Sequence, residues 1–99
     1  FVIAPEAEAD LEEIQRYYDE EVGEPLIADR LITALFRTFR KLAQTPFMGR
    51  PRDEIRPGLR SFPQNPYMIF YYVRGDVVEI AFVIHQRQDL EEVFGISLN

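Results

Sequence analysis

The stretch from Leu59 to Asp89 constrains the fold more than any other part of the chain. Two apolar runs, Tyr67 to Val73 and Val77 to Ile84, have the Val, Ile, Tyr and Phe content of buried strands. Gly75 lies in the short interval between them and can adopt the positive φ that a two-residue hairpin turn needs. We therefore predict an antiparallel hairpin, preceded by a short strand from Leu59 to Phe62.

Strict alternation along this hairpin gives each strand two faces. In the first strand, Tyr67, Ile69, Tyr71 and Val73 share one face, and Met68, Phe70, Tyr72 and Arg74 share the other. In the second strand, Val78, Ile80, Phe82 and Ile84 share a face, opposite Val77, Glu79, Ala81, Val83 and His85. Because both faces are largely apolar, the rest of the chain has to cover both of them.

Two amphipathic helices supply cover for one face. Pro5 suits a first helical turn, Gly23 ends this helix, and Pro25 begins a second one that runs to Ala43. The predicted apolar stripes are Ala7, Leu11, Ile14, Tyr18 and Val22 on the first helix, and Ile27, Leu31, Leu35, Phe39 and Leu42 on the second. The short connection predicts that the helices pack as an antiparallel pair.

With a strand at Phe1 to Ile3 and a short helical tail within 88–94, the element order is β-α-α-β-β-β. This order predicts an α+β fold in which a helical hairpin packs on an antiparallel sheet. Residues 1–99 form a single predicted domain, since no repeat, low-complexity tract or long linker divides the chain.

Composition narrows the classes of function. The chain has no cysteine, which excludes disulfides, thiolate metal sites and a cysteine nucleophile, and we expect no cofactor and no metal. It has neither a signal-peptide pattern nor an apolar run near the ~20 residues that span a bilayer, so we expect a cytoplasmic protein without membrane contact. The net charge of −6 argues against broad nucleic-acid binding, although residues 50–87 carry six basic and four acidic side chains.

Four side chains are candidates for chemistry at one end of the sheet. His85 is the only histidine and ends a strand, either as a hydrogen-bonded side chain at the sheet margin or as a functional group. Arg60 forms either a surface ion pair or a fork that captures phosphate or carboxylate. Arg87 and Asp89 form either a local pair that fixes the tail or part of the same site. No P-loop, dinucleotide fingerprint, nucleophile elbow or HExxH motif is present.

An ordered set of motifs resembles the ParE-type toxins of the ParE/RelE superfamily of bacterial toxin–antitoxin systems. These motifs are Ala9-Asp10-Leu11-x-x-Ile14-x-x-Tyr17, then Pro46-x-x-Gly49-Arg50-x-Arg52-x-x-Ile55-x-x-Gly58-Leu59-Arg60-x-Phe62, then Tyr67-x-Ile69-Phe70-Tyr71, Val78-x-Ile80 and His85-x-Arg87-x-Asp89. The resemblance covers nearly the whole chain. It implies a toxin that inhibits DNA gyrase and is neutralised by a ParD-like antitoxin in a hetero-oligomer.

The resemblance also leaves two alternatives open. RelE-like members are ribosome-dependent endoribonucleases that cut messenger RNA, and Arg60, His85 and Arg87 would then be the catalytic residues. Such members usually carry a reactive tyrosine near the C-terminus, where this chain has Phe94, so we expect no catalysis by the protein itself. A non-toxic remnant that only binds an antitoxin is the other alternative.

The same resemblance suggests where the partners bind. We expect Arg60, His85, Arg87 and Asp89 to contact the target. We expect the antitoxin to dock on the helical hairpin at Leu31, Leu35, Arg37 and Arg40, and along the free sheet edge.

Overall fold

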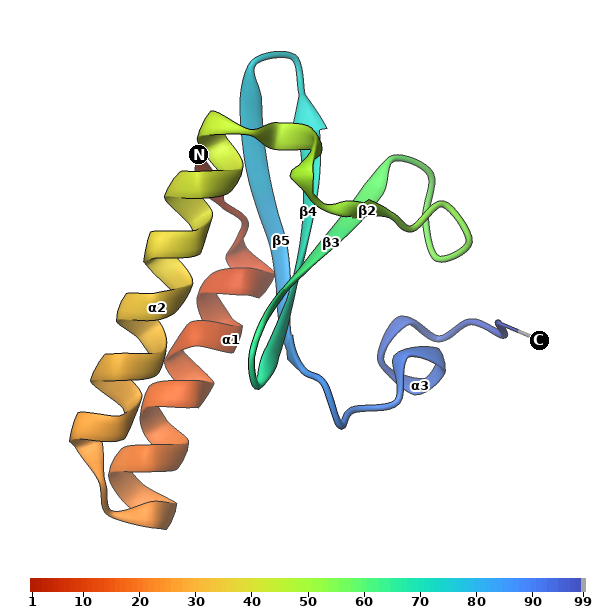
Figure 1. Ribbon diagram of the computed structural model, residues 1–99. Coiled ribbons are helices and arrows are strands. Elements are labelled where there is room, and N and C mark those ends of the chain that lie inside the picture. The colour runs from red at the N-terminus through yellow and green to blue at the C-terminus, as the bar shows by residue number, and fades with distance from the viewer. Residues whose placement is uncertain (99) are drawn as a thin grey trace.

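The computed structural model describes residues 1–98 and confirms the α+β architecture (Figure 1). The elements are β1 (Val2–Ile3), α1 (Pro5–Arg16), the π-helical segment η1 (Tyr17–Val22), α2 (Pro25–Gln44), the 3-10 turn η2 (Pro46–Met48), β2 (Arg50–Pro51), β3 (Leu59–Gln64), β4 (Tyr67–Arg74), β5 (Val77–His85) and α3 (Leu90–Phe94). The strands form one sheet in the order β1-β5-β4-β3-β2. The pair β1–β5 is parallel, whereas all the other neighbours are antiparallel.

The sheet has a hydrophobic core on each face. The antiparallel helices α1 and α2 cover one face, and α3 lies at the opposite face (Figure 1). The core under the helices contains Ala7, Leu11, Ile14, Leu35, Phe39, Leu42, Tyr67, Ile69, Tyr71, Val78, Ile80 and Val83. The core under α3 contains Ile55, Leu59, Phe70, Ile84 and Phe94. The prediction that both faces of the hairpin need cover is therefore confirmed.

A β-bulge at Ala81 changes the faces of β5. Phe70 pairs with Phe82 and Tyr71 pairs with Ile80, so Ala81 is an extra residue that opposes nothing on β4. Because two residues of β5 oppose one residue of β4 here, the alternation of side chains between the two faces of β5 inverts at this point. Val78 and Ile80 face the helices, whereas Phe82 and Ile84 face α3. The prediction that these four share a face is wrong.

The loop between α2 and β3 contains strand structure that the sequence did not predict. β2 pairs with β3 through Arg50 opposite Ser61 and Pro51 opposite Arg60. β3 also extends past Phe62 to Gln64 and includes Pro63. Since β2 covers only Arg60 and Ser61, β3 is an edge strand at Pro63, where proline costs no ladder hydrogen bond.

The turn between β4 and β5 matches its prediction. Arg74 pairs with Val77, which leaves Gly75 and Asp76 as a two-residue turn, and Gly75 has φ +65°. None of the helices formed by residues 1–98 combines the length and the apolar character that crossing a membrane requires.

Candidate functional site

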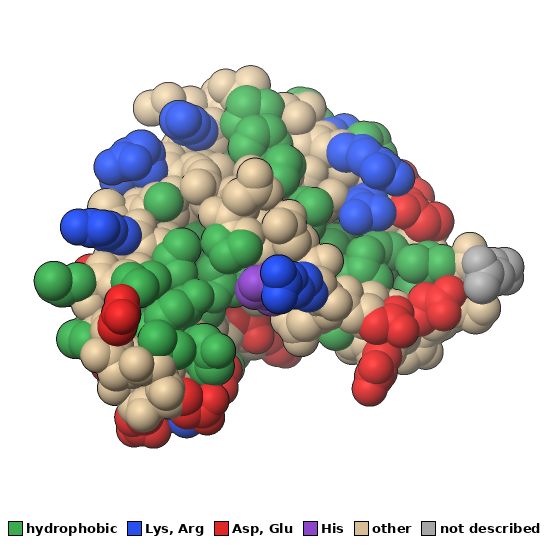
Figure 2. All heavy atoms as spheres, turned by 60° about the horizontal axis from the view of Figure 1, so that its bottom comes forward, with side chains coloured by type: hydrophobic (Ala, Val, Ile, Leu, Met, Phe, Trp, Pro, Cys, Tyr) green, Lys and Arg blue, Asp and Glu red, His purple; other side chains and the backbone are tan. Residues whose placement is uncertain are grey.

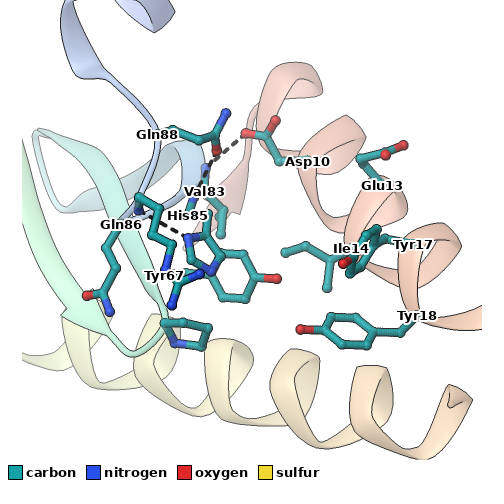
Figure 3. Close-up of a pocket in the computed structure, with 12 residues that line it drawn as sticks. Asp10, Glu13, Ile14, Tyr17, Tyr18, Tyr67, Val83, His85, Gln86 and Gln88 are labelled. Carbon is teal, nitrogen blue, oxygen red and sulfur yellow. Dashed lines mark hydrogen bonds between the residues drawn. The ribbon is translucent and has the colours of Figure 1, made fainter. Parts of the chain in front are cut away.

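An open cavity of about 600 Å³ lies between the first helix and the end of β5 (Figure 3). Its walls are Ile14 on α1, Tyr17 and Tyr18 on η1, Tyr67 on β4, and Val83 and His85 on β5. Asp10 and Glu13 on α1, with Pro66 and the turn residues Gln86, Arg87 and Gln88, complete the lining. The volume is within the usual range for ligand sites, ~300–1,000 Å³. We call this cavity the tyrosine pocket.

The helical wall depends on a change of helix type. The first helix continues past Arg16 as the π-helical segment η1 and ends at Gly23, which is left-handed at φ +75°. The wider π turn leaves Val22 41% exposed, so the prediction that Val22 continues the apolar stripe is wrong. Tyr17 and Tyr18 stack edge to face with ring centroids 5.1 Å apart, and both line the pocket.

The sheet wall is built by a cross-strand pair. Tyr67 lies directly opposite His85, and their rings meet edge to face at 5.4 Å. Tyr18 from the helix and Tyr67 from the sheet point towards each other across the pocket (Figure 3). Burial, with a smaller contribution from the neighbouring Tyr18, raises the pKa of Tyr67 to about 12. Tyr67 therefore presents a neutral phenol group on the sheet side of the pocket at physiological pH.

The imidazole of His85 has a defined hydrogen bond. Its Nδ1 accepts from the backbone N–H of Arg87 at 3.1 Å, and its own backbone N–H donates to Gln88 Oε1 at 2.9 Å. With Nδ1 as an acceptor, the neutral ring carries its proton on Nε2. His85 is therefore a hydrogen-bonded residue at the sheet margin, as one of the two sequence alternatives stated, and it also lines the pocket.

Asp10 is a pocket residue that sequence reasoning did not single out. The backbone N–H of Val83 donates to Asp10 Oδ2 at 2.9 Å, which closes the β5 edge beyond the two residues that β1 covers. Burial raises the pKa of Asp10, although the bond from Val83 opposes the shift, and the negative charge of Glu6 adds to it. One feature of the sequence could have indicated this position. Asp10 follows Ala7 by three residues and precedes Ile14 by four, so it lies on the apolar stripe of the first helix.

Glu13, the second carboxylate of the pocket, already has a cation beside it. Arg16 donates to both of its oxygens, at 2.9 and 2.6 Å, and lowers the pKa of Glu13. Arg16 also bonds to Glu20 and Glu21. Within residues 1–98, no arginine or lysine lies within 4.0 Å of the Asp10 carboxylate.

Arg60 is not part of this site. Arg60 on β3 pairs with Tyr71 of β4, whereas His85 on β5 pairs with Tyr67 of β4. Arg60 and His85 are therefore four residues apart along the strand direction, which is roughly 13 Å. The Arg60 fork donates to the carbonyl oxygens of Gly49 and Phe47 and stacks 4.8 Å from the Phe47 ring centroid. The prediction of one site at one sheet end that includes Arg60 is wrong, because Arg60 holds the loop after α2.

Arg87 and Asp89 do not form the local pair that was one of the two alternatives for them. Asp89 Oδ1 accepts from the backbone N–H of Glu91 at 3.0 Å and caps the N-terminus of α3. Arg87 is exposed, and in the part of the chain that the structure describes it forms no ion pair. The cap uses the Asp89 carboxylate and leaves the Arg87 guanidinium open to a partner.

The predicted antitoxin contacts differ in accessibility. Leu35 has no exposed surface and belongs to the core under the helices, so the prediction that it docks a partner is wrong. Leu31 is half-buried against the same core, and Arg37 and Arg40 are exposed on α2. Residues 1–98 contain no group of three or more acidic, histidine or cysteine side chains arranged to hold a metal.

Figure 2 shows the end of the molecule where the pocket opens. The single histidine lies beside a basic side chain at the margin of a broad apolar region, and acidic side chains border that region on the lower side. Tyr17, Val22 and Leu26 are the large hydrophobic side chains exposed at the tip of the helical hairpin, by 44%, 41% and 70%.

The comparisons with known proteins agree with this fold. The family model for the ParE toxin of the type II toxin–antitoxin system parDE matches residues 1–90. Toxin ParE1 of Mycobacterium tuberculosis is 33% identical over 92 residues, which cover 92% of this chain and 93% of that protein. Toxin ParE1 of Caulobacter vibrioides is 34% identical over 89 residues, which cover 90% and 91% of the two chains.

A solved structure supports the same architecture. A chain described as the chromosomal ParDE toxin–antitoxin system from P. aeruginosa superposes with a TM-score of 0.70 at 24% identity. The match covers 84% of this chain and 90% of that one. With the family model matching 90 residues and two relatives above 30% identity, the chain belongs to the ParE toxin family of type II toxin–antitoxin systems, which implies an antitoxin as its partner.

Proposed function

We propose that this toxin inhibits DNA gyrase by protein–protein contact and is neutralised by a ParD-like antitoxin. Membership of the ParE family supports the choice of target. The position of Arg60 is the observation that favours inhibition by contact over catalysis. Arg60 lies roughly 13 Å along the sheet from His85, and its guanidinium group donates a hydrogen bond to the Gly49 carbonyl.

Cleavage of RNA requires a base, an acid and a cation grouped around one phosphate. Of the three residues of the ribonuclease alternative, Arg60 is separated from His85 by four strand residues, so Arg60, His85 and Arg87 are not grouped around one point. The lone pair on His85 Nδ1 is occupied by the Arg87 backbone N–H. Phe94 is buried against Phe70 and Phe82 instead of lining the tyrosine pocket, so this position supplies no reactive group.

We propose that the turn after β5 is the gyrase contact, with Arg87 as its main side chain. Arg87 is exposed beside the pocket, and its backbone is held by the bond to His85 Nδ1. Arginine is enriched among the residues that dominate binding energy at interfaces, because its planar fork makes several directed hydrogen bonds. Asp89 contributes by capping α3, which fixes the end of this turn.

A supercoiling and cleavage assay with purified gyrase tests the proposal. The wild-type protein should stabilise cleaved DNA complexes, and added antitoxin should suppress them. Arg87→Ala should weaken the effect about tenfold or more, as expected for a central interface arginine. Arg30→Ala on α2 is the matched control and should retain full potency.

Two results would contradict the proposal. Folded protein that leaves gyrase unaffected but cuts ribosome-bound messenger RNA would favour the ribonuclease alternative. Protein that is inert towards both, yet still binds its antitoxin, would favour the non-toxic remnant.

A further inference from the structure

The charge around the tyrosine pocket selects the kind of ligand that can enter it. Residues 5–22, which form its helical side, carry eight acidic side chains and one basic side chain. Arg87 is the only formally basic side chain in the lining, on the opposite rim. An anionic ligand would meet the repulsion of this helix, whereas a cation would be attracted to it.

The walls of the pocket suit a planar cation in particular. Tyr17, Tyr18 and Tyr67 supply three electron-rich rings, and cations bind over such rings with a further gain when they are desolvated. Asp10 Oδ2 accepts from Val83, and in the part of the chain that the structure describes no donor is bonded to its Oδ1. Of the two carboxylates that line the pocket, Glu13 is paired with Arg16, whereas the half-buried Asp10 has no arginine or lysine within 4.0 Å among residues 1–98.

We propose that the tyrosine pocket binds the guanidinium group of an arginine side chain that the antitoxin presents. Arginine fits better than lysine because its fork is planar, stacks on aromatic rings and is weakly hydrated, while its outer N–H groups can donate to a carboxylate. The occupant is assigned to the antitoxin on charge complementarity with this acidic helix and on the exposed apolar tip beside it, Tyr17, Val22 and Leu26.

This inference rests on the proposed function, and it explains how neutralisation would work. An arginine seated in the tyrosine pocket brings its polypeptide over the turn from Gln86 to Gln88. The antitoxin would then cover Arg87, the side chain that we propose contacts gyrase. One pocket therefore links antitoxin binding to the loss of target binding without any change in the fold.

The first test uses small probes on the full chain. Acetyl-arginine methylamide and its uncharged isostere acetyl-citrulline methylamide are titrated separately, and the imidazole resonances of the single histidine report binding by NMR. The arginine probe should shift the His85 and tyrosine ring resonances, with an affinity about tenfold higher than that of the citrulline probe. Equal affinities for the two probes, or shifts confined to residues outside the pocket, would overturn the inference.

The second test uses matched variants of the same helix. Asp10→Asn removes the charge and keeps an oxygen that can accept from Val83, so the β5 edge stays closed. Glu12→Gln makes the same charge change at an exposed position that does not line the pocket. Asp10→Asn should weaken both the arginine probe and the antitoxin about tenfold, and Glu12→Gln should change neither by more than about twofold.

Equal losses in the two variants would mean attraction to the acidic helix as a whole, which overturns a specific site. Unchanged binding in Asp10→Asn, confirmed as folded by its thermal transition, would overturn it as well. Gyrase inhibition measured without antitoxin separates this outcome from failure of the proposed function. An active toxin with an unresponsive pocket refutes only the arginine site.

Discussion

Replacing Arg60 with methionine separates a structural role from a functional one, because methionine keeps the aliphatic stem and removes the guanidinium fork. The substitution deletes the hydrogen bond to the Gly49 carbonyl, a longer 3.4 Å bond to the Phe47 carbonyl, and the stacking over Phe47. A hydrogen bond from a charged donor contributes about 1.5–3 kcal/mol, and Arg60 is partly exposed, so the lower end applies. Phe47 is 68% exposed, which limits its cation–π contact to about 0.5 kcal/mol.

The total predicted loss is about 2 kcal/mol, which for a domain of this size lowers the melting temperature by about 8–16 °C. Urea denaturation and calorimetry measure the loss, and gyrase inhibition is measured below the transition, per folded molecule. We expect the Arg60→Met protein to be less stable than the wild type but to inhibit gyrase fully. The Arg87→Ala protein should be as stable as the wild type and should inhibit gyrase weakly. A stable Arg60→Met protein that no longer inhibits gyrase would refute the assignment of Arg60 to the scaffold.

Three further substitutions test the packing and the pocket. Tyr71→Phe should destabilise the protein by about 1–3 kcal/mol in urea denaturation, because the buried hydroxyl accepts from Gly49 N–H and donates to the Pro46 carbonyl, and no change would contradict this. Phe94→Ala should either lower the free energy of unfolding by about 3–5 kcal/mol or release α3 locally and expose the sheet face beneath it. Hydrogen exchange distinguishes global destabilisation from local release of α3. For Asp10, burial raises the folded-state pKa above the ordinary 3.8, so the ionised form costs stability above the raised pKa. The Asp10→Asn protein should therefore have a higher free energy of unfolding than the wild type at neutral pH. This difference, measured by urea denaturation, should shrink as the pH falls through the raised pKa towards 3.8.

The elements that sequence analysis located well are those in which burial follows a regular period. The stripe through Leu35, Phe39 and Leu42 predicted α2 to within one residue at its C-terminal end. Gly75 located the hairpin turn because a positive φ restricts the choice of residue there. In each case one local physical requirement leaves a mark that can be read without knowledge of the neighbouring elements.

Other features depended on contacts that no local pattern reports. Arg60 alternates on its strand like a surface residue, yet its partners are carbonyl groups at Phe47 and Gly49, in a loop that follows a different helix. Gly49 itself must be glycine, because a Cβ there would clash with the Tyr71 hydroxyl. Leu35 lies in the apolar stripe that predicted α2, and its complete burial follows that stripe and not the docking role that we also expected of it.

The bulge at Ala81 joins these two kinds of feature. Without it, Val83 would share a face with Val77 and Ala81, as strict alternation requires; with it, Val83 and His85 turn to the side of the first helix. Asp10 can then bond the backbone of Val83 and close the sheet edge, but only by placing a carboxylate in a half-buried position with no cation beside it. A charge held in this way is costly unless a partner offsets it, so the same bulge that builds the pocket also leaves in it a carboxylate that the proposed guanidinium group would offset.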